Sequence, residues 1–234
     1  MARTAVQGRL SWRVATLAAI REETATARTL VFDLPDWPGH LPGQHVDVRL
    51  TAEDGYSTQR SYSLASDDGV ELTVQKVNDG EVSPYLAGTL KVGDPLELRG
   101  PVGGWFVWRP TDTQPVLLVA GGSGIVPLRA MIRARRTAES RVPFRLIYSA
   151  RTPEDIIYAD ELRHSVGGLD VYYFYSRGAT RQRLGVAEVN THGWPAEFEP
   201  DCFVCGPTGF VERVADILVA LGHHPRKVKT ERFG

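Results

Sequence analysis

Five consecutive apolar residues, Val116-Leu117-Leu118-Val119-Ala120, constrain the fold of this chain more than any other stretch. A run of this kind, without polar alternation, is typical of a strand that is buried on both faces of a parallel sheet. The glycine-rich turn Gly121-Gly122-Ser123-Gly124 follows the run and leads into a helix expected over residues 128–136. The stretch therefore predicts an α/β domain in which strands and helices alternate.

The rest of the second half continues this alternation. We expect the following strands and helices: strands at 144–148, 171–175, 201–205 and 226–232, and helices at 153–164 and 208–221. Alternating strands and helices imply a parallel sheet that is covered by helices on both faces.

The first hundred residues have a different sequence pattern, with short apolar runs separated by turns such as Asp54-Gly55 and Gly93-Asp94. We expect six strands, at 10–17, 29–34, 45–50, 61–65, 70–77 and 95–98. Closely spaced strands of this kind predict a small antiparallel barrel or sandwich. A short helix is expected to interrupt them, with Ser83 as its N-cap and Pro84 as its first residue. A hinge rich in glycine and proline places the domain boundary near residue 110, which divides the chain into 1–110 and 111–234.

Composition excludes several classes of protein. The 234 residues carry a net charge of -1, which gives no general attraction to nucleic acid or to a membrane surface. No apolar run is long enough to span a bilayer, and the first residues lack the apolar segment of a secretion signal. Two cysteines cannot build a disulfide framework, which favours a cytoplasmic protein.

The segment Arg60-Ser61-Tyr62-Ser63 combines side chains suited to a flat, anionic ligand. Arginine binds phosphate through a planar fork of donors, and tyrosine offers a flat apolar ring. A serine hydroxyl can reach a ring nitrogen. On these residues alone, an ordinary barrel strand remains an open alternative.

Three further places suit phosphate groups. The turn at 121–124 and the short helix after Ser83 each offer unpaired backbone N–H groups at a helix start. The second strand of this half ends in Ser149-Ala150-Arg151, without the acid that would hold a ribose. The third ends in Ser176-Arg177, and Arg181 and Arg183 follow closely. Serine and arginine at these two strand ends suit a phosphomonoester better than a bare ribose. A plain turn and solubilising surface arginines remain the alternatives.

Cys202 and Cys205 match a C-x-x-C pattern, but we reject the redox and metal interpretations. Positions three apart in a strand point to opposite faces, and no second cysteine or histidine pair completes a zinc site. Cys202 is expected in the core, and Cys205 at the carboxyl end of its strand, where open α/β sheets bind ligands.

Four motifs in this order resemble the ferredoxin–NADP reductase superfamily: Arg60-Ser61-Tyr62-Ser63, residues 80–83, residues 121–127 and Cys205-Gly206-Pro207. The resemblance covers nearly the whole chain. It implies two domains: an N-terminal antiparallel β-barrel that binds a flavin, and a C-terminal α/β domain, with a parallel sheet, that binds a nicotinamide dinucleotide. FAD is favoured over FMN because two phosphates need two sets of donors.

The resemblance also implies a role for each motif. Arg60 would pair with the flavin pyrophosphate, Tyr62 would pack on the isoalloxazine, and Ser63 would lie near flavin N5. Further pyrophosphate contacts would come from Gly80, Val82 and Ser83. The nicotinamide dinucleotide would be bound by Gly122, Ser123, Gly124, Pro127, Arg151, Ser176, Arg177, Arg183, Cys205, Gly206 and Pro207. The Ser-Arg pair and the following arginine favour NADPH, with NADH as the alternative.

The C-terminal residues add a further match. Many members of the superfamily have a carboxylate two residues before an aromatic ring that covers the other flavin face, and Glu231 and Phe233 have this spacing. Two departures are that the aromatic residue is Phe and that Gly234 follows it. Ser63, Cys205, Glu231 and Phe233 are therefore the expected catalytic group. No four-cysteine set exists, so an iron–sulfur partner is expected to be a separate protein.

The resemblance implies a flavoprotein reductase that passes electrons from NADPH through FAD to a ferredoxin or an oxygenase component. Reduction of free flavin or another small acceptor, and a role as an electron-transfer subunit of a fixed complex, are the alternatives. Arg129, Arg133 and Arg136 share one face of the helix expected after the glycine turn. Two interpretations are open: a basic docking face for an acidic ferredoxin, or an ordinary solvated helix face.

Overall fold

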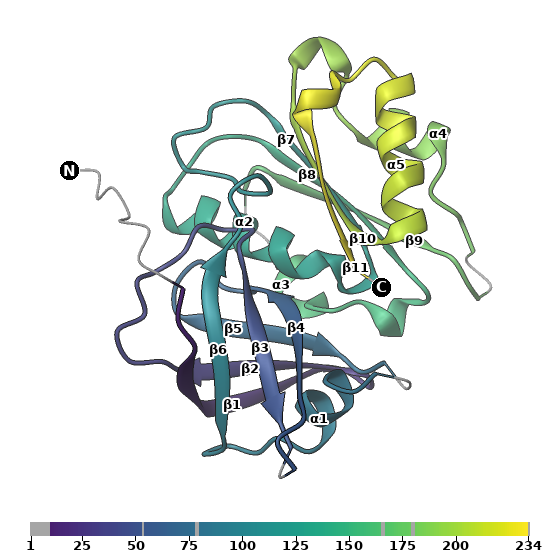
Figure 1. Ribbon diagram of the computed structural model, residues 1–234. Helices are drawn as coiled ribbons and strands as arrows, with labels where there is room; N and C mark the ends of the chain where they lie inside the picture. Colours follow the sequence, from purple (N-terminus) through teal and green to yellow (C-terminus); the bar gives the residue numbers. More distant parts are fainter. Residues whose placement is uncertain (1–9, 53, 78–79, 165–166, 179–180, 234) are drawn as a thin grey trace.

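The computed structural model describes residues 10–52, 54–77, 80–164, 167–178 and 181–233, so the expectation about the first residues of the chain lies outside it. The described residues form two domains, one above the other in Figure 1. The first domain is built on an antiparallel sheet and the second on a parallel sheet, as the sequence predicts.

All six strands expected in the first domain are present: β1 (Arg13–Thr24), β2 (Ala27–Asp33), β3 (His45–Thr51), β4 (Ser57–Ser63), β5 (Val70–Gln75) and β6 (Pro95–Val102). They pair in the order β4-β3-β6-β1-β2-β5. An antiparallel bridge between Leu64 and Leu72 joins the two edges of this sheet and closes it into a barrel. Alternate side chains point inward, which gives the barrel a core of leucine and valine.

The short helix of the barrel is α1 (Ser83–Gly88), and it begins one residue earlier than expected. Val82, not Ser83, is the N-cap residue, so the assignment of Ser83 as N-cap was wrong. The hydroxyl of Ser83 instead accepts a hydrogen bond of 3.1 Å from the backbone N–H of Val77. This bond ties the start of the helix to the residues that follow β5.

The second domain contains five parallel strands in the order β11-β10-β7-β8-β9. Their bounds are β7 (Val116–Gly121), β8 (Phe144–Ala150), β9 (Leu169–Tyr175), β10 (Asp201–Pro207) and β11 (Val228–Phe233). The central strand β7 is the apolar run from which the α/β prediction began, and all its residues are buried. Residues of α2 (Ile125–Thr137) and α3 (Ala159–Arg163) pack on one face. The other face is covered by α4 (Val186–His192), which the sequence did not predict, and α5 (Thr208–Ala220).

The helix predicted over 153–164 is wrong. The chain forms a 3-10 turn, η2 (Pro153–Asp155), and α3 begins only at Ala159. Tyr158 lies between them with a φ of 64°, a left-handed conformation that is unusual for a bulky residue. Its buried hydroxyl bonds to Thr73 of the barrel. The tertiary contact of this tyrosine therefore accompanies the break in the helix.

The two cysteines face opposite sides of β10, as predicted. Cys202 lies in the core beneath α4 and α5, and Cys205 lies in the core on the barrel side. Two smaller elements, η3 (Ala196–Phe198) and η4 (Pro225–Lys227), flank the last two strands. No helix in the described ranges is long and apolar enough to cross a membrane.

Candidate active site

A hydrogen bond joins the two domains at the ends of β4 and β11. The hydroxyl of Ser63 donates to Oε1 of Glu231 over 2.7 Å, although the two residues are 168 positions apart in the chain. Glu231 is in register with Cys205 on the neighbouring strand β10. The structure therefore brings together three of the four residues that the sequence predicts as catalytic.

Parallel strands explain why these residues meet. Cys205 and Glu231 both lie near the carboxyl ends of their strands, and such ends share one edge of the sheet. The fourth expected residue, Phe233, lies two positions further along β11, in register with Pro207. Its side chain is 39% exposed, so its ring is accessible at this edge.

His45 also lies at this end of β4, next to Ser63, although the sequence did not predict it as a site residue. It is the direct cross-strand partner of Ser63 in the antiparallel pairing of β3 with β4. Directly opposed residues point to the same face of a sheet, so His45 lies beside Ser63. Its positive form would lower the pKa of Glu231. Strand register could have identified His45, but register is not readable from residue types alone.

Burial sets the protonation of the groups at this edge. It raises the pKa of the Cys205 thiol well above its ordinary value, and the carboxylate of Glu231 adds to this effect. Cys205 is therefore a neutral thiol near pH 7 and not a thiolate nucleophile. Burial likewise raises the pKa of Tyr62 to about 12, against the opposing effect of Arg60. The arrangement suits alignment of a ligand more than covalent catalysis.

Burial also raises the pKa of Glu231, while the bond from Ser63 and the proximity of His45 oppose it. A raised pKa means that the folded protein retains a proton that the unfolded chain would already release. The free energy of unfolding therefore falls as the pH rises from the ordinary carboxyl pKa through the raised pKa of the folded protein. Glu231→Gln keeps an acceptor for Ser63 but has no charge to bury. We expect it to raise the melting temperature at about pH 8 and to change it little at about pH 4, below the ordinary carboxyl pKa.

Thermal unfolding of the parent protein and of the Glu231→Gln variant at both pH values measures this effect. The exposed Glu212→Gln, on α5, is the matched control and should show no such pH-dependent gain. An equal gain from Glu231→Gln at both pH values would mean that the buried charge is not its cause.

The glycine turn packs directly against the end of β10. A Cβ atom on Gly124 would lie 2.1 Å from the carbonyl oxygen of Cys205, so this position accepts only glycine. A Cβ on Gly206 would lie 3.1 Å from the Cα of Gly121. In contrast, a Cβ on Gly122, which has a φ of 55°, would meet nothing within 4 Å. The turn is thus supported on one side and open on the other, as a cradle for a ligand must be.

The residues expected to bind the flavin lie together on the barrel. Arg60 on β4 is 60% exposed, and its guanidinium lies 4.0 Å from the carboxylate of Glu81, just before α1. Tyr62 packs against the barrel core, while Val82 and Ser83 are buried at the start of α1. Gly80 lies close to Ser83, since a Cβ at Gly80 would be 3.1 Å from its hydroxyl.

The strand ends expected to bind a phosphomonoester are also adjacent. The backbone N–H groups of Ser176 and Arg177 donate to the carbonyl oxygens of Ala150 and Arg151. The N–H of Gln182 donates to the carbonyl of Tyr175, which returns the chain to the end of β9 before Arg183. Arg151, Arg177 and Arg183 are exposed at this corner of the sheet.

The docking face expected from Arg129, Arg133 and Arg136 is wrong. Arg129 is only 3% exposed, and Arg133 is 19% exposed. Both are paired with Glu71 of the barrel and with Glu161 of α3, so they face the domain junction. Only Arg136, of these three, is exposed to solvent. Helical spacing placed the three on one surface but did not show what covers it.

Comparison with known proteins identifies two family models in the chain. The oxidoreductase FAD-binding domain matches residues 14–107, and the oxidoreductase NAD-binding domain matches residues 118–216. A similar solved structure is the flavohem-like FAD/NAD binding domain of nitric oxide dioxygenase from Vibrio cholerae. It is 26% identical with a TM-score of 0.83, and the match covers 95% of this chain and 98% of that one.

Similar curated proteins are reductase components. The glycine betaine monooxygenase reductase subunit of Pseudomonas aeruginosa is 33% identical over 91% of this chain and 62% of its own length. The ferredoxin reductase component of 3-ketosteroid-9-alpha-monooxygenase from Rhodococcus rhodochrous is 30% identical over 94% of this chain and 64% of its own length. The chain thus spans slightly less than two thirds of these relatives.

Proposed function

We propose, from the premise that this chain belongs to the ferredoxin reductase-type family of FAD- and NAD-binding oxidoreductases, that it passes electrons from a nicotinamide dinucleotide to a separate redox protein. The observation that carries the proposal is the meeting of Ser63, Glu231 and Cys205 across the domain junction. FAD, when bound, supplies the chemistry by accepting a hydride and releasing electrons singly. The protein supplies position and electrostatics.

The residues on the barrel fit a flavin dinucleotide. We assign Arg60 to the pyrophosphate, because its exposed guanidinium can form a charge-assisted pair with a phosphate. Gly80, Val82 and Ser83 are assigned to the same group through their position at the start of α1. We assign the neutral phenol of Tyr62 to one face of the isoalloxazine ring and the ring of Phe233 to the opposite face.

The residues of the α/β domain fit the nicotinamide dinucleotide. We assign its pyrophosphate side to the glycine turn and the start of α2, with Gly122, Ser123, Gly124 and Pro127. Cys205, Gly206 and Pro207 are assigned to the nicotinamide, because they lie at the strand end next to Glu231. The neutral thiol of Cys205 then acts by alignment, and so does the hydroxyl of Ser63.

We favour NADPH as the coenzyme and assign its extra phosphate to Ser176, Arg177 and Arg183, with Arg151 close to them. The second strand of this domain, β8, ends at Ala150 and is followed directly by Arg151, so this strand end supplies no acid to hold a bare ribose. Arginine at such a corner forms paired hydrogen bonds with a phosphomonoester.

Arg177→Ala is expected to lower kcat/KM for NADPH about tenfold to 100-fold and to leave kcat/KM for NADH nearly unchanged, because only NADPH carries the phosphate. Steady-state kinetics with both coenzymes measures this. Arg141→Ala, at an exposed arginine before β8, is the matched control. A parent protein that prefers NADH would refute the phosphate assignment.

We propose that the acceptor is a ferredoxin or an oxygenase component and that the protein works in the cytoplasm. Support for the acceptor comes from the names of its relatives, a monooxygenase reductase subunit and a ferredoxin reductase component. Support for the cytoplasm comes from the low number of cysteines, which suits a reducing compartment. The FAD-loaded protein should be reduced under anaerobic conditions. It should then be mixed by stopped flow with a ferredoxin, a Rieske-type oxygenase component or free FMN. Fast oxidation by a protein acceptor is the expected result. Oxidation by free FMN alone would identify a flavin reductase, and absence of any coenzyme oxidation would identify an electron-transfer subunit.

A further inference from the structure

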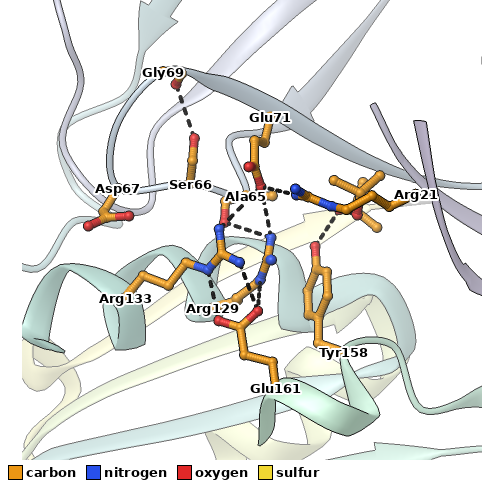
Figure 2. Close-up of polar contacts among 12 residues, drawn as sticks. Arg21, Ala65, Ser66, Asp67, Gly69, Glu71, Arg129, Arg133, Tyr158 and Glu161 are labelled. Atoms are coloured by element: carbon orange, nitrogen blue, oxygen red, sulfur yellow. Dashed lines mark hydrogen bonds and ion pairs between the residues drawn. The ribbon is translucent and has the colours of Figure 1, made fainter. Parts of the chain in front are cut away.

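A cluster of five charged residues crosses the domain junction beside α2 (Figure 2). We call it the interdomain ion cluster; it consists of Arg21, Glu71, Arg129, Arg133 and Glu161. Arg21 and Glu71 belong to the barrel, whereas the other three belong to α2 and α3. None of the five is assigned to flavin or coenzyme binding, and the burial of Arg129 and Arg133 excludes the docking face expected from them.

Glu71 is the centre of the cluster on the barrel side. Its Oε2 atom lies 2.7 Å from Arg21, 3.1 Å from Arg129 and 3.2 Å from Arg133. Glu161 holds the same two arginines from the other side, since the Nε atoms of Arg129 and Arg133 each lie 2.8 Å from one of its oxygens. The two guanidinium groups are therefore fixed between a carboxylate of each domain.

Both carboxylates are ionised near neutral pH. Burial alone would raise the pKa of Glu71 and of Glu161, but the surrounding arginines outweigh burial and leave both pKa values below the usual range. A buried ion pair of this kind contributes little net stability, because desolvation opposes the attraction. It does penalise any arrangement in which one partner loses the other. The cluster is therefore suited to selecting one orientation of the domains.

Arg129 connects the cluster to the candidate active site. Its Nη1 donates to the backbone carbonyl of Ala65 over 3.3 Å, and Ala65 lies two residues after Ser63. Arg129 also lies in the helix that starts directly after the glycine turn. One buried side chain thus joins the helix behind the nucleotide-binding turn to the segment that carries Ser63.

Tyr158 supports this side chain. The guanidinium of Arg129 lies 4.0 Å from the centre of the Tyr158 ring, and the tyrosine hydroxyl bonds to Thr73 on β5. Tyr158 has the left-handed backbone conformation that breaks the expected helix. Strained residues of this kind persist where the surrounding structure determines them, and here the surroundings include a contact with the other domain.

We infer that Arg129 and Arg133 are positioning residues, which hold the two domains in the orientation that places Ser63 beside Glu231 and Cys205. They act at a distance from these groups, through Ala65 and Glu71 on the barrel. The effect on hydride transfer rests on the proposed function, whereas the effect on domain orientation does not.

The test compares Arg129→Met and Arg133→Met with Arg136→Met in the FAD-loaded protein. All three residues lie on α2, and Arg136 is exposed, which makes its substitution the matched control. Val14→Cys and Val219→Cys place one spin label on each domain, at positions 60% and 45% exposed. The native cysteines are buried, so labelling at the new thiols is selective. Pulsed electron paramagnetic resonance then measures the distribution of distances between the two spin labels, and so the orientation of the domains.

We expect Arg129→Met and Arg133→Met to shift or broaden this distance distribution and to slow flavin reduction by NADPH about tenfold to 100-fold. The dissociation constant of the coenzyme should change much less. The primary kinetic isotope effect, measured with coenzyme deuterated at the transferred position, should be larger than in the parent protein, because the reacting atoms are misaligned. Arg136→Met should change none of these quantities. Arg133→Met keeps the contacts of Arg129 with Glu161 and Ala65, so it serves if Arg129→Met does not fold.

An unchanged distance distribution in both variants would overturn the inference. So would a changed distribution with an unchanged rate of flavin reduction, because the orientation would then not govern the site. If the parent protein oxidises no coenzyme, the proposed function fails. The distance measurement still decides whether the cluster orients the domains.

Discussion

Replacing Ser63 with alanine is expected to slow reduction of the bound flavin by NADPH about 100-fold, while flavin retention changes little. The hydroxyl donates over 2.7 Å to Glu231, which comes from the other domain, so its loss removes a contact that aligns the two halves of the site. It also leaves the partly buried carboxyl group of Glu231 without its donor. Flavin retention is assigned instead to Arg60 and the start of α1, which the substitution leaves intact.

Two measurements separate these effects. Stopped-flow absorbance of the FAD-loaded protein gives the rate of flavin reduction, and titration of the protein without flavin gives the FAD dissociation constant. Ser61→Ala is the matched control, because Ser61 lies on the same strand but donates to Asp47 within the barrel. Equal losses of rate and of flavin affinity in Ser63→Ala would contradict an alignment role.

The place of Cys205 at the carboxyl end of a buried strand could be predicted from local pattern, whereas Ser63 and Glu231 were expected at the site from the family resemblance. The apolar run of β7 and the turn after it indicate a parallel sheet, and parallel strands place their carboxyl ends at one edge. The opposite directions of Cys202 and Cys205 follow from the alternation of a strand. The spacing of Glu231 and Phe233 resembles that of the family, and the register of β10 with β11 places Glu231 beside Cys205.

The domain junction could not be predicted in the same way. Arg129 and Arg133 have the helical spacing of a solvated face, and residue types do not show which surface another domain will cover. Tyr158 interrupts the expected helix just before α3, and its hydroxyl contacts Thr73, which is 85 positions away in the chain. His45 reaches the site through strand register. These residues depend on tertiary contacts, which override local preference.

Replacing Gly124 with alanine is expected to have the largest effect on the α/β domain. The added Cβ would lie 2.1 Å from the carbonyl oxygen of Cys205 and 2.7 Å from the nitrogen of Gly206, and both are backbone atoms that cannot rotate away. Gly124 has a φ of -62°, which alanine adopts readily, so the steric clash is the source of the effect. Either the glycine turn or the end of β10 must move, at a cost of about 3 kcal/mol or more.

This movement should lower stability and coenzyme binding together, because the turn and the Cys205 strand end form opposite sides of one site. Thermal unfolding and coenzyme titration of the FAD-loaded protein measure the two effects, with an expected loss of coenzyme affinity of about 100-fold. Gly209→Ala is the matched control. Its Cβ would meet nothing within 4 Å at the start of α5, and alanine favours a helix over glycine by about 1 kcal/mol. A Gly124→Ala protein with the parent's stability and coenzyme affinity would show that the close approach of turn and strand is not required.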